Sequence, residues 1–234
     1  MTRRDQIAAG LAAVTARIER ACRRVGRDPA EVTVVVVTKT FPAADVRLLA
    51  DLGVRDVGES RDQEAAPKAA ACADLGVTWH FVGKLQTNKA VSVARYADVV
   101  HSVDRIRLVD ALDRAAWAAG RELRCLVQVS LADGPRDSAE RGGAAPADVP
   151  ALADRIAAAH SLRLAGVMAV APLRGDPDDA FSRLTRVAET VQTRHSAATW
   201  VSAGMSGDLE AAVAHGATHL RVGTAILGAR PPAG

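Results

Sequence analysis

Short apolar runs alternate with longer helical segments along almost the whole chain. The joint Asp-Leu-Gly-Val occurs at 51–54 and again at 74–77, and Ala-His-Gly-Ala at 214–217 is a looser third copy. Each copy places a glycine between a helical stripe and the next apolar run, which is where glycine commonly ends a helix. Repeated strand–helix units with one type of joint predict a parallel sheet.

The apolar runs give eight predicted strands. We assign them to 33–38, 54–58, 78–83, 98–103, 123–130, 164–170, 199–203 and 219–224. The first holds four consecutive valines, and such a run without alternation is typical of a strand that is buried on both faces. Eight strand–helix units in 234 residues favour one α/β domain over residues 1–234, a TIM (β/α)8 barrel. A doubly wound open sheet is the alternative, although no GxGxxG follows the first strand.

Local signals mark the helices and one long loop. Thr2 and Asp5 fit a capping box that opens an extra helix before the barrel, and this helix should end near Gly26. Pro42 suits the first position of the helix after strand one. The stretch 131–150 is rich in Gly, Pro and Ala, and we expect a flexible loop there on the carboxyl rim of the barrel.

Composition argues against several classes of protein. The net charge is +3, aromatic residues make up 3%, and there is one tyrosine, which disfavours a nucleic-acid-binding surface. Cys22, Cys72 and Cys125 have no CxxC spacing, so we expect three reduced thiols in a cytoplasmic protein. No apolar run approaches the roughly 20 residues that span a bilayer. The N-terminus does not have the pattern of a signal peptide, and we expect no membrane partner.

A lysine, Lys39, directly follows the first strand and stands between two threonines. Burial of an unpaired ammonium group lowers its pKa by roughly 3–5 units. Lys39 is therefore either a solvent-exposed residue at the end of the strand or a residue with a chemical role in a functional site. In a TIM barrel the working residues gather at the carboxyl ends of the strands, and Lys39 stands at such an end.

The segments after strands seven and eight occupy the place of the usual phosphate site in a TIM barrel. Gly204, Met205 and Ser206 follow strand seven, and glycine there permits close approach of the backbone to a ligand. We expect Ser206 at the start of a helix, whose free N–H groups attract anions. Gly223 and Thr224 follow strand eight and add backbone N–H groups and a hydroxyl.

A lysine that faces a phosphate cradle suits an aldehyde that carries a phosphate, because the amine can form a Schiff base with the carbonyl. Pyridoxal 5′-phosphate (PLP) meets both demands, and so does the sugar-phosphate substrate of an aldolase. Arg221 lies two residues before Gly223 and so on the same face of the strand. Arginine commonly partners the pyridine nitrogen of PLP, which it keeps unprotonated. We therefore expect PLP as the cofactor and no metal.

The remaining titratable residues fit structural roles. The six histidines show no HxH or HExxH spacing, and His101 is the one that we expect at the rim of the barrel. We interpret Glu59 and Glu64 as helix-cap and ion-pair residues rather than an acid–base pair. Tyr96 falls in the predicted helix after strand three, away from the rim.

Seven segments, spread over nearly the whole chain, carry a family resemblance. The most specific are WHFVGKLQTNK at 79–89 and RVGTAILGAR at 221–230, and the others are TKTFP, GESRDQE, HSVDR, GVMAV and GMSGDLEAAV. Together they resemble the segments of the pyridoxal phosphate homeostasis proteins. The resemblance implies a single barrel like the PLP domain of alanine racemase.

The resemblance also implies roles for individual residues. Lys39 matches the lysine that holds PLP as a Schiff base. Ser206, Gly223 and Thr224 match the segments that hold the phosphate, and Arg221 matches the arginine that faces the pyridine nitrogen.

Two departures from the family pattern affect the expected site. Ser60 stands where the family has an asparagine after Gly-Glu, and its shorter side chain changes that cofactor contact. The loop after strand five is longer than in the family, and Arg141 is a candidate counterpart of a family lysine there.

The resemblance implies a protein that binds, buffers or delivers PLP and that catalyses no established reaction. PLP-dependent apoenzymes are the candidate partners, and a closed barrel with a long first helix is compatible with a monomer. The alternative is an amino-acid racemase or decarboxylase, which needs a second base and usually a β-rich C-terminal domain. This chain ends ten residues after Thr224. A Schiff-base aldolase would need a proton shuttle beside the lysine, and no such pair stands out.

Overall fold

Eight parallel strands close into a barrel in the computed structural model, which describes residues 1–131, 142–172 and 174–229. Each strand pairs with the next one along the chain, and β8 pairs with β1. The strands are β1 (Thr33–Val37), β2 (Asp56–Glu59), β3 (Thr78–Phe81), β4 (Val99–Val103), β5 (Leu123–Gln128), β6 (Leu162–Met168), β7 (Trp200–Ser202) and β8 (His219–Val222). The predicted TIM (β/α)8 barrel is confirmed.

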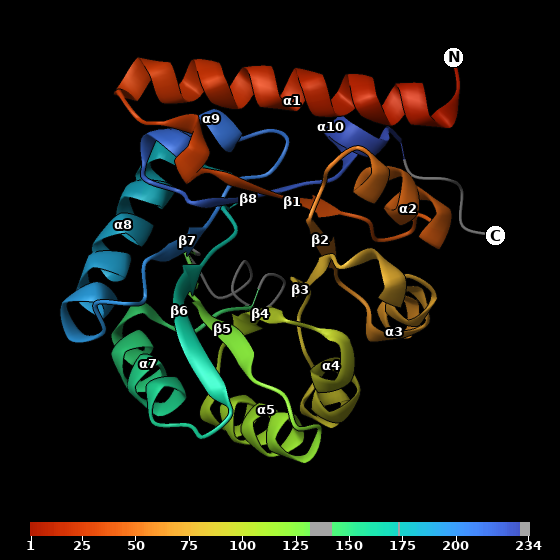
Figure 1. The fold of residues 1–234 in the computed structure, drawn as a ribbon. Coiled ribbons are helices and arrows are strands. Elements are labelled where there is room, and N and C mark those ends of the chain that lie inside the picture. The colour runs from red at the N-terminus through yellow and green to blue at the C-terminus, as the bar shows by residue number, and fades with distance from the viewer. Residues whose placement is uncertain (132–141, 173, 230–234) are drawn as a thin grey trace.

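Helices surround this barrel on its outside (Figure 1). They are α1 (Arg3–Val25), α2 (Ala43–Asp51), α3 (Asp62–Ala71), α4 (Ala90–Tyr96), α5 (Ile106–Ala118), α7 (Val149–Ala157), α8 (Pro177–Arg194), α9 (Leu209–Ala214) and α10 (Thr224–Leu227). Leu108 and Leu112 of α5 and Phe181 of α8 are among the apolar side chains buried between helices and strands. Each such burial contributes about 1.5–3 kcal/mol to the free energy of unfolding.

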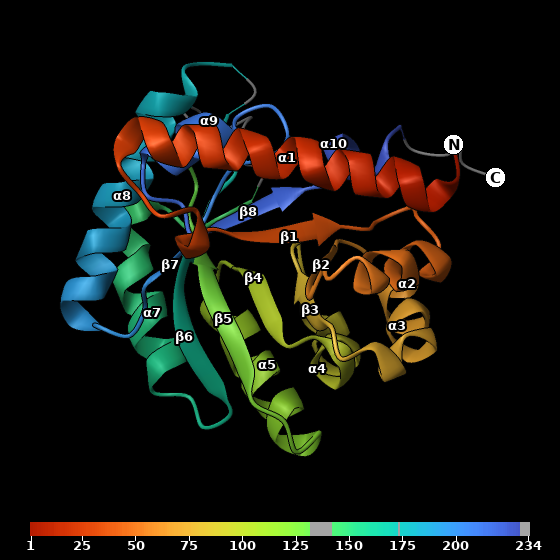
Figure 2. The ribbon, with the colours of Figure 1, turned by 45° about the horizontal axis from the view of Figure 1, so that its top comes forward.

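The extra helix α1 lies across α9 and α10, as both ribbon views show (Figure 2). Its predicted capping box is confirmed, because Thr2 Oγ1 accepts from Asp5 N and Asp5 Oδ2 accepts from Thr2 N. Gly26 ends the helix in the left-handed conformation, as expected. Gly10 lets α1 approach α10 closely, since a Cβ there would lie 2.5 Å from the carbonyl oxygen of Ile226.

The structure corrects two predicted boundaries. Pro42 is the N-cap of α2 rather than its first helical residue, because its backbone is extended with ψ 164°. The predicted loop at 131–150 extends too far, because a 3-10 turn at Pro146–Asp148 leads into α7 at Val149. Residues 132–141 of that loop, and with them Arg141, lie outside the described residues.

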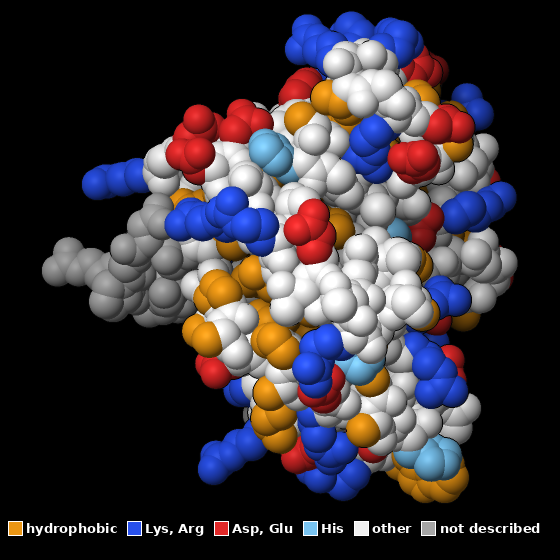
Figure 3. All heavy atoms as spheres, turned by 90° about the vertical axis from the view of Figure 1, so that its left-hand side faces the viewer, with side chains coloured by type: hydrophobic (Ala, Val, Ile, Leu, Met, Phe, Trp, Pro, Cys, Tyr) orange, Lys and Arg blue, Asp and Glu red, His pale blue; other side chains and the backbone are white. Residues whose placement is uncertain are grey.

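The outer surface that carries α7 and α8 mixes charges of both signs. Figure 3 shows Lys and Arg side chains interspersed with Asp and Glu on this face. One such pair is Arg194 with Asp154, which joins α8 to α7. No helix in the described residues is long and apolar enough to cross a membrane.

Candidate functional site

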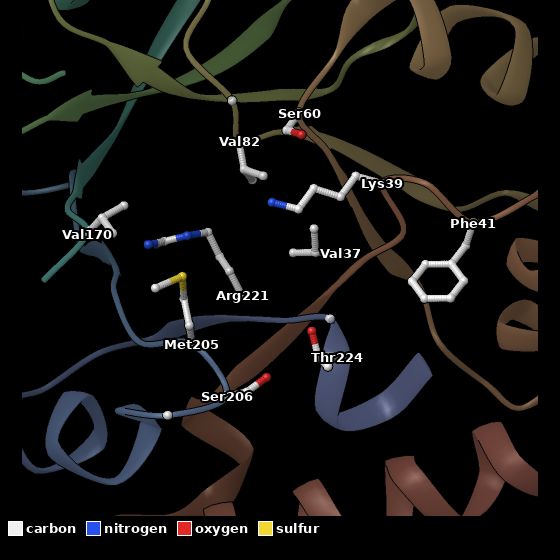
Figure 4. A pocket seen from close by; sticks show the side chains of 13 residues that line it. Val37, Lys39, Phe41, Ser60, Val82, Val170, Met205, Ser206, Arg221 and Thr224 are labelled. Atoms are coloured by element: carbon white, nitrogen blue, oxygen red, sulfur yellow. The ribbon is translucent and has the colours of Figure 1, made fainter. Parts of the chain in front are cut away.

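A cavity of about 390 Å³ opens at the carboxyl end of the barrel (Figure 4). A volume in this range is typical of sites for small ligands and cofactors. The cavity is lined by Val37, Lys39, Phe41, Ser60, Val82, Gly83, Val170, Met205, Ser206, Gly207, Arg221, Gly223 and Thr224. Two of these described residues carry positive charge and none is a carboxylate, so the cavity favours an anionic ligand.

The structure brings seven of the eight predicted site residues to the wall of this cavity. They are Lys39, Ser60, Met205, Ser206, Arg221, Gly223 and Thr224. In Figure 4 the Lys39 amine and the Arg221 guanidinium point into the space, and the hydroxyls of Ser206 and Thr224 lie along one side. That these residues hold a cofactor stays a prediction.

Gly204 lies directly before the lining segment and shapes it. Its φ of +89° is in the left-handed region that favours glycine, and a Cβ there would lie 2.6 Å from the Cβ of Ala212. Its carbonyl oxygen accepts from the backbone N–H of Arg221 at 2.9 Å. Gly204 therefore joins the end of β7 to β8 next to the cavity.

A buried ion pair fixes the backbone just before Lys39. Lys68 of α3 donates to the carboxylate of Glu59 at the end of β2 and to the carbonyl oxygen of Thr38, the latter at 2.9 Å. The hydroxyl of Thr38 donates to the same Glu59 carboxylate at 2.6 Å. Both charged side chains are almost fully buried. The interpretation of Glu59 as an ion-pair residue is confirmed.

The backbone just after Lys39 is held by the same helix. Thr40 has a φ of +70°, which is unfavourable for a β-branched residue. Its N–H donates to the Glu64 carboxylate at 3.0 Å, and this bond keeps the pKa of Glu64 below its usual value. Glu64 also pairs with Arg61. Glu59 and Glu64 of the segment GESRDQE therefore hold the residues on either side of Lys39 by hydrogen bonds and ion pairs. They do not form an acid–base pair.

The Ser206 segment is held from outside the barrel by α1. Arg17 donates to the carbonyl oxygen of Ser206 at 2.9 Å and forms an ion pair with Glu210 at 2.7 Å. The prediction that Ser206 starts a helix is wrong, because α9 begins only at Leu209. A turn intervenes, in which Asp208 accepts from the backbone N–H of Met205 at 2.6 Å.

Arg221 reaches the cavity from inside the barrel. Its guanidinium donates to Ser202 Oγ at 2.7 Å and to the carbonyl oxygen of Ala169 at 2.8 Å. Burial lowers the pKa of Arg221 to about 10, so the group stays charged at neutral pH. A guanidinium has five N–H donors, and these two contacts leave others that can face a ligand.

The expectation that His101 lies at the rim is wrong. Strand β4 continues to Val103, so His101 sits in the middle of the strand and is fully buried inside the barrel. It bonds to His80 at 2.8 Å and to Ser202 at 2.9 Å. The described residues contain no cluster of His, Cys, Asp or Glu that could hold a metal ion.

Sequence reasoning missed the apolar walls of the cavity. Val37, Phe41, Val82 and Val170 line it. Val82 directly follows β3 and Val170 comes two residues after β6, so a search of all strand ends for apolar as well as polar residues would have found both. Such walls exclude water and hold the flat face of an aromatic ligand.

The arrangement can bind an anionic carbonyl compound covalently. A primary amine points into the cavity, two hydroxyls lie on one side, and a fixed guanidinium lies on another. An amine in such a place can form a Schiff base.

Comparison with known proteins gives consistent matches. The family described as alanine racemase, N-terminal domain, matches residues 10–231. The pyridoxal phosphate homeostasis protein of Mycobacterium bovis is 46% identical, with 97% of this chain and 94% of the relative covered. The protein of the same name from Escherichia coli K12 is 37% identical, with 97% of each chain covered.

Solved structures agree with these matches. PipY of Synechococcus elongatus, solved with PLP bound, is 35% identical with a TM-score of 0.78, and the match covers 91% of this chain and 100% of PipY. Alanine racemase of Corynebacterium glutamicum is 14% identical with a TM-score of 0.71. That match covers 98% of this chain but 62% of the racemase, and it shows a shared fold.

Proposed function

The chain belongs to the family of the pyridoxal phosphate homeostasis proteins, and on this premise we propose that it binds PLP and takes part in PLP homeostasis by binding, buffering or delivering the cofactor. The observation that carries the proposal is that an amine, an arginine and two hydroxyls converge on one cavity, and that none of the described residues lining it is a carboxylate. This donor set fits a phosphorylated aldehyde, and PipY, the relative solved with PLP bound, supports the choice of PLP.

The proposed roles follow from the positions of the side chains. Lys39 Nζ attacks the aldehyde carbon, water leaves, and a Schiff base joins PLP to the chain. Ser206, Gly223 and Thr224 hold the phosphate on their side of the cavity. Arg221 faces the ring nitrogen, and its positive charge keeps that nitrogen unprotonated.

Three neighbouring residues complete the proposed site. Gly204 and Met205 set the path of the phosphate loop, because they connect β7 to the turn that carries Ser206. Ser60 lies beside Lys39 at the end of β2 and offers a hydroxyl where an asparagine is expected in the family. A hydroxyl on this side reaches less far into the cavity than an amide would.

We expect Lys39 to be the residue that carries PLP. The protein loaded with PLP should show the yellow absorption band of a Schiff base, and borohydride reduction followed by peptide mapping should find the label on Lys39. Lys39→Ala should lose the band, while the control Lys84→Ala should keep it, because Lys84 does not line the cavity. A label on Lys84 or Lys89 would contradict the assignment.

We propose further that the protein does not turn over amino acids. A racemase needs two positioned bases, and among the described residues that line the cavity Lys39 is the one side chain that we assign as a candidate base. Tyr96 lies in α4, and its hydroxyl is buried away from the cavity, where burial raises its pKa. The nearby charges of Asp62 and Glu59 raise it further.

This expectation is tested by incubating the PLP-loaded protein with L-amino acids in deuterated water. We expect neither exchange of the Cα proton nor inversion at an enzymatic rate, which would be on the order of 1 per second or faster. Turnover at such a rate that is abolished by Lys39→Ala would instead establish the racemase alternative.

We also propose the partners, the oligomeric state and the cellular compartment of the protein. PLP-dependent apoenzymes are the proposed recipients of the cofactor, and the chain is proposed to act as a monomer in the cytoplasm. Three unpaired, buried cysteines, Cys22, Cys72 and Cys125, fit a reducing compartment.

A further inference from the structure

A chain of hydrogen bonds runs through the inside of the barrel to Arg221. We call its members the interior chain; they are Ser202 of β7, His101 of β4, His80 of β3 and Asp56 of β2. The four distances from Arg221 to Asp56 are 2.7, 2.9, 2.8 and 2.9 Å in that order. Asp56 is the first residue of its strand and its side chain is 27% exposed, so the chain ends at the face opposite the cavity.

The two ends of the interior chain set its direction. A guanidinium can only donate and a carboxylate can only accept. Ser202 Oγ accepts from Arg221, and we assign its own proton to the bond with His101 Nδ1. The ring of His101 then carries its proton on Nε2 and donates to His80 Nδ1, which leaves the Nε2 proton of His80 for Asp56. Every bond in the series therefore points from the cavity to the far end.

The surroundings of His101 agree with this direction. Its ring is fully buried, and burial lowers its pKa well below the usual value, with His80, Arg221 and His219 as further causes. A neutral imidazole has one donor nitrogen and one acceptor nitrogen, as the directed series requires. Hydrogen bonds that point the same way polarise one another, so a change of charge at one end of the series alters the hydrogen bond at the other end.

We propose that the interior chain positions Arg221 against the ring nitrogen of PLP, and that it couples this nitrogen to the carboxylate at the far end of the barrel. The inference rests on the proposed function, because Arg221 meets a ring nitrogen only when PLP occupies the cavity. Ser202 anchors one arm of the guanidinium and the carbonyl of Ala169 anchors the other, so the plane of Arg221 is fixed by groups that lie inside the barrel. The interior chain members are positioning residues that do not line the cavity.

The first test uses the native protein and needs no cofactor. Nitrogen NMR of 15N-histidine-labelled protein at neutral pH should show His101 as a neutral ring that carries its proton on Nε2. A proton on Nδ1 of His101 would reverse the chain and overturn the proposal, whether or not the protein binds PLP.

The second test follows the ring nitrogen of 15N-labelled PLP in the loaded protein. Arg221→Met supplies the reference signal for a nitrogen without its arginine. Ser202→Ala and Asp56→Asn should both move the native signal toward that reference. Asp56→Asn replaces one carboxylate oxygen by an NH2 group at the face opposite the cavity, so the native fold should persist and no side chain that lines the cavity changes.

The matched control is His219→Gln. His219 is also a buried histidine of the barrel interior, and its ring packs on Trp200 and lies 6.4 Å from that of His80, but its hydrogen bond goes to Thr218 and not to a member of the interior chain. The ring-nitrogen signal should stay in place in this variant. No shift in Asp56→Asn, or an equal shift in His219→Gln, would overturn the proposal. If the native protein shows no Schiff-base band at all, the proposed function fails instead, and the histidine measurement still decides the direction of the chain.

Discussion

Replacement of Lys68 by methionine should lower the free energy of unfolding by about 3–5 kcal/mol, because it leaves the buried carboxylate of Glu59 without its cation. Both side chains are almost fully buried, and burial already raises the pKa of Glu59 against the opposing charge of Lys68. The carbonyl of Thr38 would lose a donor as well. Chemical denaturation of the PLP-free protein measures the change, and PLP affinity should fall with it, since Thr38 precedes Lys39.

Two further variants separate the ion pair from general effects of losing a lysine. Lys89→Met removes a cation that is 35% exposed and lies 3.7 Å from Asp62, so it should cost at most about 1 kcal/mol. Adding Glu59→Gln to Lys68→Met should recover part of the loss, because a neutral amide is cheaper to bury than an unpaired carboxylate. Equal losses in Lys68→Met and Lys89→Met would show that the buried pair does not anchor the segment.

Acidification from pH 6.5 to 4.5 should weaken the folded state through two histidines that are buried as neutral rings. Burial lowers the pKa of His219 to about 4 and that of His101 well below its usual value. The unfolded chain takes up these protons near pH 6.5 and the folded chain does not. The free energy of unfolding therefore decreases as the pH is lowered across this window. Together the two rings contribute a loss of about 4–5 kcal/mol.

Glu59 works in the opposite direction, since its raised pKa lets the folded state take up a proton first. The comparison between variants is therefore the decisive measurement. His219→Gln should reduce the loss between pH 6.5 and 4.5 by about 2 kcal/mol, as followed by urea denaturation at several pH values. Measurements at pH 8–9 give the baseline, where both rings are neutral in either state. The same loss in the native protein and the variant would contradict this account.

The amino-acid sequence contained most of the fold because the fold repeats a local unit. Each predicted strand corresponds to an observed one, and the ends differ by a few residues, as for β6, which begins at Leu162 rather than at residue 164. Strand ends are the hardest boundaries to predict, because pairing with a neighbour extends a strand beyond its apolar run. For His101 the strand end at residue 103 was predicted correctly, and the error was to expect a residue two positions before that end at the rim.

The candidate site was predictable for a related reason. Parallel strands in a closed barrel place all their carboxyl ends on one face, so Lys39, Ser206 and Thr224 had to meet even though they are far apart in the sequence. The resemblance of GESRDQE and RVGTAILGAR to family segments added the roles. The clamp formed by Glu59 and Glu64 was foreseen only as ion-pair chemistry, without its partner Lys68.

The sequence by itself therefore determined the number and order of strands and the set of residues on the carboxyl face, because periodicity and strand ends are local properties of a chain. Only the tertiary structure decided which groups meet out of sequence. It joined Lys68 to Glu59, Arg17 to the carbonyl of Ser206, and Arg221 through the interior chain to the far end of the barrel. Such partners depend on strand register and on how helices pack against the barrel. A hydrophobic period of two or 3.6 residues predicts on which face of a strand or helix a side chain lies, but it does not predict which residues that side chain contacts.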